Sequence, residues 1–468
     1  MGRRIGGRWI GVSERSAMAV VGLATASWVG ITLPALSPGM EISSPEAALS
    51  SPPQSLTDLY QLRDQLQNQL QAPQPSPLPL SLGQPPRGNP TTVTTLDPAD
   101  QLWAVHHRIR HEELAQSLWQ QAARQGDQAY ALGDATTLPD EIVPVAYAQW
   151  QQTLYTLSQV PPTSFVAPAA ATQAALYRQQ LATLAYRYDT LRSEFLFTIA
   201  NQVGDASRVR ITVCNLQREC RRWQGNRPPA NPASLIKVPV AVALMAKLQQ
   251  EGVDPQVGLW VNPSNWTEDA GWIRVRSQYA VEQVMADMIS RSGNVATNQL
   301  IDYLGWEGVN QSLQAQGYTS TRITTKLVGD KTYPANRGFA PNQLTTDELT
   351  DMMVGIYNQE YPGSDAIQAA LANQVDIRLG KTALRPPMIW LGEKTGRNSQ
   401  VIGSTTAVLI GGKPYIITAT LDHSGNEAAL RSVMADVAEH ILTHHGFDSL
   451  GLAFPPTQPP LPSRAFLP

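Results

Sequence analysis

The sequence predicts an α+β (or α/β) sandwich, an antiparallel sheet with packed helices, preceded by a helical module and a Pro-rich linker. Two observations lead to this prediction. Within residues 206–447, β-rich stretches lie at both ends, helical stretches lie between them, and one more helical stretch closes the segment. Before it, residues 97–205 place apolar side chains near a helical period, and residues 37–96 are rich in Pro, Ser and Gln.

The N-terminal segment, residues 1–36, predicts export. Positive residues come first, and the uncharged stretch 17–36 follows them, a pattern typical of a signal peptide or a membrane anchor (Arg3, Arg4, Arg8, Arg15). A cleaved signal and a retained anchor both remain open. Either one places the rest of the chain in the periplasm or cell envelope, secreted or membrane-anchored.

Residues 37–96 are expected to form an extended linker, because their composition cannot bury a core. Within it, residues 55–71 have apolar residues at helical spacing and predict a short amphipathic helix. Residues 448–468 are Pro-rich and are expected to be a disordered tail.

Residues 97–205 predict a helical accessory region. It contains His106, His107 and His111, but at most two of them can share a helix face, and no matching ligand set follows. We therefore expect a solvated helix face rather than a metal site, and we expect no metal or organic cofactor. The net charge is −3, with no long basic block, which argues against nucleic acid as a partner.

From residue 207 the pattern changes. A β-rich run with a turn after it contains Cys214 and Cys220, and a hairpin here would bring the two sulfurs together. An oxidising compartment would permit that disulfide. Helical stretches cover 235–250 and 279–304, two strands fill 405–421, and an amphipathic helix covers about 426–444.

Ser234 and Lys237 stand at the start of an apolar run that predicts a buried helix. Pro239 fits only near a helix start, so Lys237 lies one turn after Ser234 on the same face. A serine hydroxyl needs a base to act as a nucleophile. A lysine serves as that base only when neutral, which burial and a second cation both favour.

Two later motifs supply the remaining groups, Ser292-Gly293-Asn294 and Lys394-Thr395-Gly396. Each motif alone is weak evidence, and a helix-capping serine with an exposed lysine is the ordinary explanation for the first pair. In this order and spacing, however, the three motifs resemble those of penicillin-binding proteins and serine β-lactamases, class A in particular. The resemblance covers about 207–447 and implies the fold of those enzymes.

The resemblance implies a role for each matching residue. Ser234 would be the acylated nucleophile, Lys237 its proton acceptor, and Ser292 the group that passes a proton to the leaving nitrogen. Lys394 would supply the second cation. The substrate would be bound by Asn294, Thr395, Gly396 and Arg397, with the backbone N–H groups of Ser234 and Arg397 as the oxyanion hole.

The sequence departs from class A β-lactamases at the deacylation step. Their Glu-x-x-Leu-Asn motif is absent from the corresponding stretch, 324–353, where Asp330 is the candidate base for water. Gly293 replaces an aspartate that would brace the second motif. Arg397 is bulky and cationic, and it could bind a substrate carboxylate or point to solvent; Arg378 and Arg385 are alternatives for that contact.

The predicted function is that of an exported serine hydrolase acting on β-lactams through an acyl-enzyme, with slow turnover because the glutamate is missing. A peptidoglycan D,D-peptidase acting on stem peptides is one alternative. A non-catalytic cell-wall binding protein that kept the fold is another.

Overall fold

The computed structural model describes residues 52–72, 97–268 and 271–448. The expected signal or anchor at 1–36, most of the linker and nearly all of the expected tail lie outside these residues. Among the helices in the described ranges, none is long and apolar enough to cross a membrane. The chain divides into two compact units, residues 1–106 and 107–468.

Helix α1, Leu56–Gln71, covers the stretch that the sequence predicts to be a short amphipathic helix. The Ser55 hydroxyl accepts a hydrogen bond from the backbone N–H of Asp58, which caps the helix start. Leu59 and Leu66, seven residues apart, are the buried positions of this helix.

The accessory region contains three long helices: α2, Pro98–Ala131; α3, Val143–Ser158; and α4, Ala167–Leu191. From residue 107 onward, these helices bury one shared core. Small side chains of α2 at a seven-residue spacing (Ala115, Ala122 and Ala129) allow the helices to approach closely, and the rings of Trp150 and Tyr177 fill the space between them.

The sandwich is built on a five-stranded antiparallel sheet of order β2-β1-β7-β6-β5. The strands are β1, Val209–Asn215; β2, Cys220–Trp223; β5, Ile389–Arg397; β6, Val401–Ile410; and β7, Lys413–Asp422. Strands β6 and β7 are joined by Gly411 and Gly412 alone. Both have positive φ (57° and 78°), as a two-residue hairpin turn requires.

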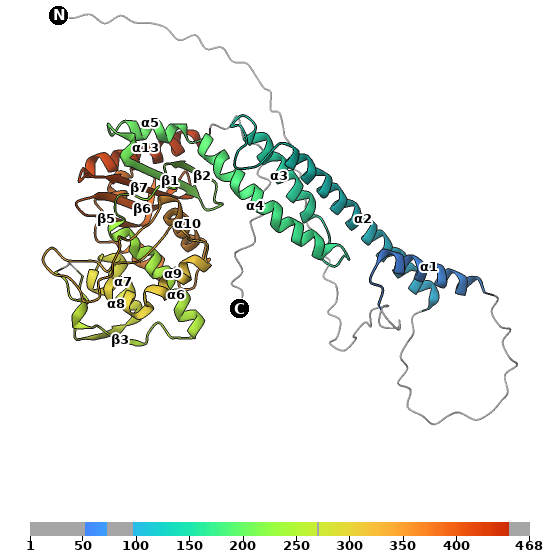
Figure 1. Cartoon of the computed structure of the whole chain (residues 1–468), viewed down its shortest axis with the longest axis horizontal. Helices are drawn as coiled ribbons and strands as arrows, with labels where there is room; N and C mark the ends of the chain where they lie inside the picture. The colour runs from blue at the N-terminus through green and yellow to red at the C-terminus, as the bar shows by residue number, and fades with distance from the viewer. Residues whose placement is uncertain (1–51, 73–96, 269–270, 449–468) are drawn as a thin grey trace, which may run out of the picture. The chain divides into compact units, whose positions relative to one another are not determined.

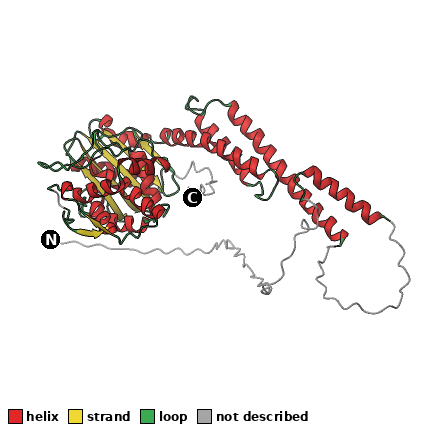
Figure 2. Cartoon of the chain, turned by 60° about the horizontal axis from the view of Figure 1, so that its bottom comes forward, coloured by secondary structure: helices red, strands yellow, loops and turns green. Residues whose placement is uncertain are grey.

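Helices cover both faces of this sheet (Figures 1 and 2). One face packs against α5, Glu194–Asn201; α12, Gly380–Ala383; and α13, Glu427–His444. The other face contacts α10, Thr346–Tyr357, and α11, Ser364–Ala372. These two helices share one core with α6, Lys237–Glu251; α7, Val281–Ser290; α8, Asn294–Leu304; and α9, Trp306–Ala315. A small second sheet pairs β3, Gly258–Trp260, with β4, Gln278–Ala280. The predicted fold class, an antiparallel sheet between packed helices, is confirmed.

Two details differ from the expectation. Helix α5 packs against the sheet, so the sandwich includes a helix that lies within the stretch 97–205, expected to be the accessory region. The helical stretch 279–304 is two helices, because Ser292 has a left-handed backbone conformation (φ 59°) that ends α7 and precedes α8.

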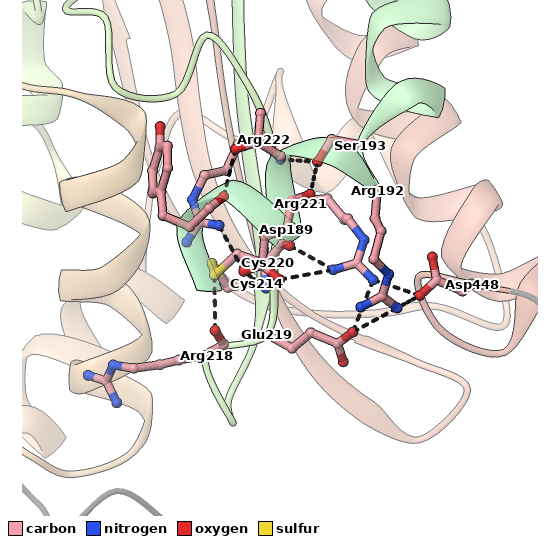
Figure 3. Close-up of polar contacts among 12 residues, drawn as sticks. Asp189, Arg192, Ser193, Cys214, Arg218, Glu219, Cys220, Arg221, Arg222 and Asp448 are labelled. Carbon is pink, nitrogen blue, oxygen red and sulfur yellow. Dashed lines mark hydrogen bonds and ion pairs between the residues drawn. A yellow bond between two sulfur atoms is a disulfide. The ribbon is translucent and has the colours of Figure 1, made fainter. Parts of the chain in front are cut away.

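The junction between α4 and the edge strand β2 is polar (Figure 3). Asp189 of α4 accepts hydrogen bonds from the Arg222 guanidinium at 2.8 Å and from the Cys220 backbone N–H at 3.3 Å. Arg221, which is fully buried, donates to Asp448 at 2.7 Å. The structure joins Cys214 to Cys220 by a disulfide across the β1–β2 hairpin. Asp189 thus provides an acceptor for a backbone N–H of the edge strand, which has no neighbouring strand on that side.

Candidate active site

Ser234 lies in a 3₁₀ turn, Ala233–Ile236, directly before α6. It is partly buried, and its hydroxyl makes no hydrogen bond to any residue in the described ranges. Strand β5 approaches this turn at Gly396, where an added Cβ would lie 3.0 Å from the Leu235 backbone nitrogen and 3.2 Å from the Pro232 carbonyl oxygen. Glycine at 396 therefore allows the third motif to pack directly against the serine turn.

Lys237 is the first residue of α6 and has no exposed surface. Its Nζ donates to the Ser292 carbonyl oxygen at 2.5 Å, to the Ser292 Oγ at 3.0 Å and to the Asn294 Oδ1 at 2.9 Å. The first and second predicted motifs therefore meet through one amine.

Lys394 of β5 is also fully buried, and its Nζ donates to the Ser292 Oγ at 3.1 Å and to the Thr395 carbonyl oxygen at 2.9 Å. Burial lowers the pKa of Lys394 to about 7, against smaller opposing effects of the carboxylates of Asp376 and Glu393. This amine can therefore gain or lose a proton close to neutral pH.

The other residues of the third motif have neighbours that the sequence did not indicate. The Thr395 hydroxyl lies 3.2 Å from the side-chain amide of Gln374. Arg397 pairs with Glu427 at the start of α13, at 2.5 Å, so this guanidinium does not simply point to solvent. Arg378 pairs with the same carboxylate at 3.1 Å, and Arg385 is exposed.

Asp330, the candidate base for deacylation, is exposed and makes no hydrogen bond or ion pair with the residues that the structure describes. In the same loop, the backbone of Leu327 is bound to α8. Asn298 of α8 donates to the Leu327 carbonyl oxygen and accepts from its backbone N–H, both at 2.8 Å. The structure thus brings Lys237, Ser292, Asn294 and Lys394 together by hydrogen bonds and does not bring Asp330 to them.

Sequence reasoning missed a buried carboxylate beside Lys394. Glu393 has no exposed surface and accepts hydrogen bonds from the Gly380 backbone N–H at 2.7 Å and the Ser404 hydroxyl at 3.0 Å. Burial raises the pKa of this carboxyl group. Successive side chains of a strand lie on opposite faces, so Glu393 lies on the face of β5 opposite to Lys394. This alternation is the signal in the sequence that could have identified the carboxylate.

Among the described residues, no group of three or more His, Cys, Asp or Glu side chains could hold a metal ion. The chemistry that the site can perform rests on its hydroxyls and amines. Ser292 Oγ lies within hydrogen-bond distance of both lysines, so it can relay a proton between groups on either side.

The model of the β-lactamase enzyme family matches residues 196–445. PBP-A is similar in structure at 24% sequence identity and a TM-score of 0.47, over 54% of this chain and 97% of that one. A variant of PBP-A in an acyl-enzyme complex with penicillin G has the same identity and TM-score, over 53% and 97%.

A β-lactamase from Sphaerobacter thermophilus is similar at 19% identity and a TM-score of 0.46, over 53% of this chain and 95% of that one. No curated protein matches the chain. The family match covers more than half of the sequence and spans every residue that the three motifs contribute. The chain therefore belongs to the β-lactamase enzyme family, whose members are serine hydrolases of the β-lactamase and penicillin-binding type.

Proposed function

We propose that this protein is an exported serine hydrolase that β-lactams acylate at Ser234 and that releases them slowly. The observation that carries the proposal is the Ser292 hydroxyl, which lies 3.0 Å from the Lys237 amine and 3.1 Å from the Lys394 amine. A hydroxyl between two buried amines is a proton relay rather than a structural contact alone.

In the proposed acylation, the Ser234 oxygen attacks the lactam carbonyl carbon while its proton passes to the neutral Lys237 amine. The C–N bond of the lactam then breaks and an ester bond to Ser234 remains. The leaving nitrogen receives a proton from the Ser292 hydroxyl, which is replenished from Lys237. Lys394 in its ammonium form favours the neutral state of Lys237 and attracts a substrate carboxylate.

Hydrolysis of that ester requires a base that activates water. Asn298 holds the loop to α8 at Leu327, whose hydrocarbon side chain cannot act as a base. Asp330 is exposed and has no hydrogen bond or ion pair with the site among the residues that the structure describes. Both observations support slow release of the acyl group. We therefore expect the acyl-enzyme to accumulate.

A peptidoglycan D,D-peptidase is the second candidate, because it shares the acylation step. The same loop favours it, since an amine of a second peptide strand can accept the acyl group without a dedicated base for water. Export is part of both proposals. The arginine-flanked apolar segment at 17–36 supports it, and a disulfide is expected in an oxidising compartment.

Mass spectrometry of the intact protein after incubation with benzylpenicillin tests the proposal. We expect a mass increase equal to one intact penicillin, its absence in Ser234→Ala, and its persistence after free penicillin is removed. No adduct in the wild-type protein would contradict the enzyme proposal and favour a non-catalytic cell-wall binding protein on the same fold. Release of D-Ala from a stem-peptide mimic would identify the D,D-peptidase.

A further inference from the structure

The loop Ser292–Gly293–Asn294 needs support from its surroundings. Ser292 has a φ of 59°, a left-handed conformation that is unfavourable for any residue with a Cβ. The loop nevertheless presents the Ser292 carbonyl oxygen, the Ser292 hydroxyl and the Asn294 amide oxygen to the single amine of Lys237. Small shifts of the loop would separate these groups, because hydrogen bonds weaken steeply with distance and angle.

Asp287 of α7 lies against this loop. Its side chain is only 1% exposed, and its Oδ1 accepts a hydrogen bond from the Trp272 backbone N–H at 2.9 Å. Its backbone carbonyl oxygen accepts from the N–H groups of Arg291 at 3.1 Å and Gly293 at 3.3 Å. The main chain of Asp287 therefore binds the loop, and its carboxylate lies beside the loop.

The space beside Gly293 is occupied by that carboxylate. An ideal Cβ on residue 293 would overlap the Asp287 Oδ2 and would lie 3.2 Å from its Cγ, and the overlap with Oδ2 is closer than real Cβ atoms approach. Gly293 has an ordinary φ of −61°, so its backbone conformation does not explain the glycine. The Asp287 carboxylate thus fills the position that a Cβ on residue 293 would need, and this is the shared position.

We propose that Asp287 is the positioning residue for this loop, supplying from α7 the carboxylate that the centre of the motif lacks. The carboxylate lies at the N-terminus of α8, for which Gly293 is the N-cap, and negative charge stabilises a helix at that end. Asp287 acts through Ser292 and Asn294, and not on the substrate itself. The acylation part of this inference rests on the proposed function.

Thermal unfolding tests the shared position without reference to any activity. Gly293→Ala forces a methyl group against Asp287 and is expected to lower the Tm by about 5 °C. In the Asp287→Ala background the same substitution meets free space, and we expect it to lower the Tm by less than about 1 °C. An equal loss of Tm in both backgrounds would overturn the inference.

Acylation by a fluorescent penicillin tests the positioning role. Asp287→Ala is expected to lower the second-order acylation rate constant about tenfold, equivalent to ~1.4 kcal/mol of activation free energy. The relocated carboxylate in Asp287→Ala/Gly293→Asp is expected to recover most of that loss. Glu282→Ala, in the first turn of the same helix, is the matched control and is expected to keep the wild-type rate.

The outcomes separate the two proposals. If Asp287→Ala and wild type acylate equally, the positioning role is wrong while the enzyme proposal stands. A similar loss that the relocated carboxylate does not recover also contradicts the role, because a general weakening of the fold would give it. If wild type forms no adduct at all, the enzyme proposal and the catalytic half of this inference are both wrong, and the unfolding cycle still decides the shared position.

Discussion

Lys237 and Lys394, two lysines without exposed surface, donate hydrogen bonds to the same hydroxyl oxygen, that of Ser292. One lysine begins α6 and the other lies in β5, so the site exists only when helix and sheet have packed. Two ammonium groups sharing one acceptor repel each other, which favours a state in which at least one amine is neutral. This packing supports the proposal that one of the two amines acts as the base for the serine.

Ser292→Ala removes the oxygen between the two amines. We expect the rate constant for acylation by a fluorescent penicillin to fall by about 10² or more, because proton transfer to the leaving nitrogen loses its donor. Ser290→Ala is the matched control: its hydroxyl bonds to the Ala286 carbonyl oxygen within α7, and acylation should be unchanged. Equal rates for Ser292→Ala and wild type would show that Ser292 does not relay the proton.

Lys394→Met is expected to change how stability depends on pH. Burial lowers the pKa of Lys394 from 10.5 to about 7. Between those two values the unfolded chain binds the proton and the native protein does not, so native stability rises with pH across that window. Below the native pKa both states are protonated, and the burial penalty is present in full.

Methionine cannot be charged, so the variant escapes this penalty. Urea unfolding at about pH 6 and about pH 9.5 gives the difference in unfolding free energy between the variant and wild type at each pH. This difference should favour the variant by ~3 kcal/mol more at about pH 6 than at about pH 9.5. Lys413→Met, at the exposed β6–β7 turn, is the control and should show no such difference. The absence of any such difference would mean that the native fold keeps Lys394 charged across this pH range.

The three motifs could be recognised in the sequence because their residue types, order and spacing resemble those of penicillin-binding proteins and serine β-lactamases. Ser234 and Lys237 are one turn apart, and a buried helix starting at that point was visible in the apolar run. The antiparallel sheet was predictable from its strand pattern, including the two strands over 405–421, whose turn the structure places at Gly411 and Gly412.

The supporting contacts were not predictable, because each one joins elements that are distant in sequence. Arg397 pairs with Glu427 only because α13 begins beside the end of β5. Asp330 looked like a candidate base from its place in the sequence, but the loop is fixed at Leu327 instead. The resemblance to class A β-lactamases implies an aspartate where Gly293 stands, but only packing shows that the carboxylate of Asp287 lies beside it.

Asp330→Asn tests whether this carboxylate activates water. Because Asp330 is exposed and has no contact with the site in the described residues, we expect the acyl-enzyme to persist equally in the variant and in wild type. The measurement is the decay of the penicillin adduct after removal of free ligand, followed by mass spectrometry. A much longer adduct lifetime in Asp330→Asn would identify Asp330 as the base after all.

Asn298→Ala tests the attachment of the loop that carries Leu327. The fully buried Asn298 side chain satisfies both backbone groups of Leu327, and its loss leaves two polar groups without these partners. Each such group costs about 1–3 kcal/mol when it stays buried, so we expect unfolding free energy to fall by roughly 2–4 kcal/mol in urea unfolding.

The matched control for this change is Asn373→Ala, whose exposed side chain bonds to the Ala369 carbonyl oxygen at a helix end. It should cost less than about 1 kcal/mol, because water can replace the lost contact. The loop should also become sensitive to proteolysis in Asn298→Ala while it stays resistant in the control. Equal stability and equal resistance in the two variants would mean that Asn298 does not hold the loop, and that other contacts such as those of the buried Lys326 fix it instead.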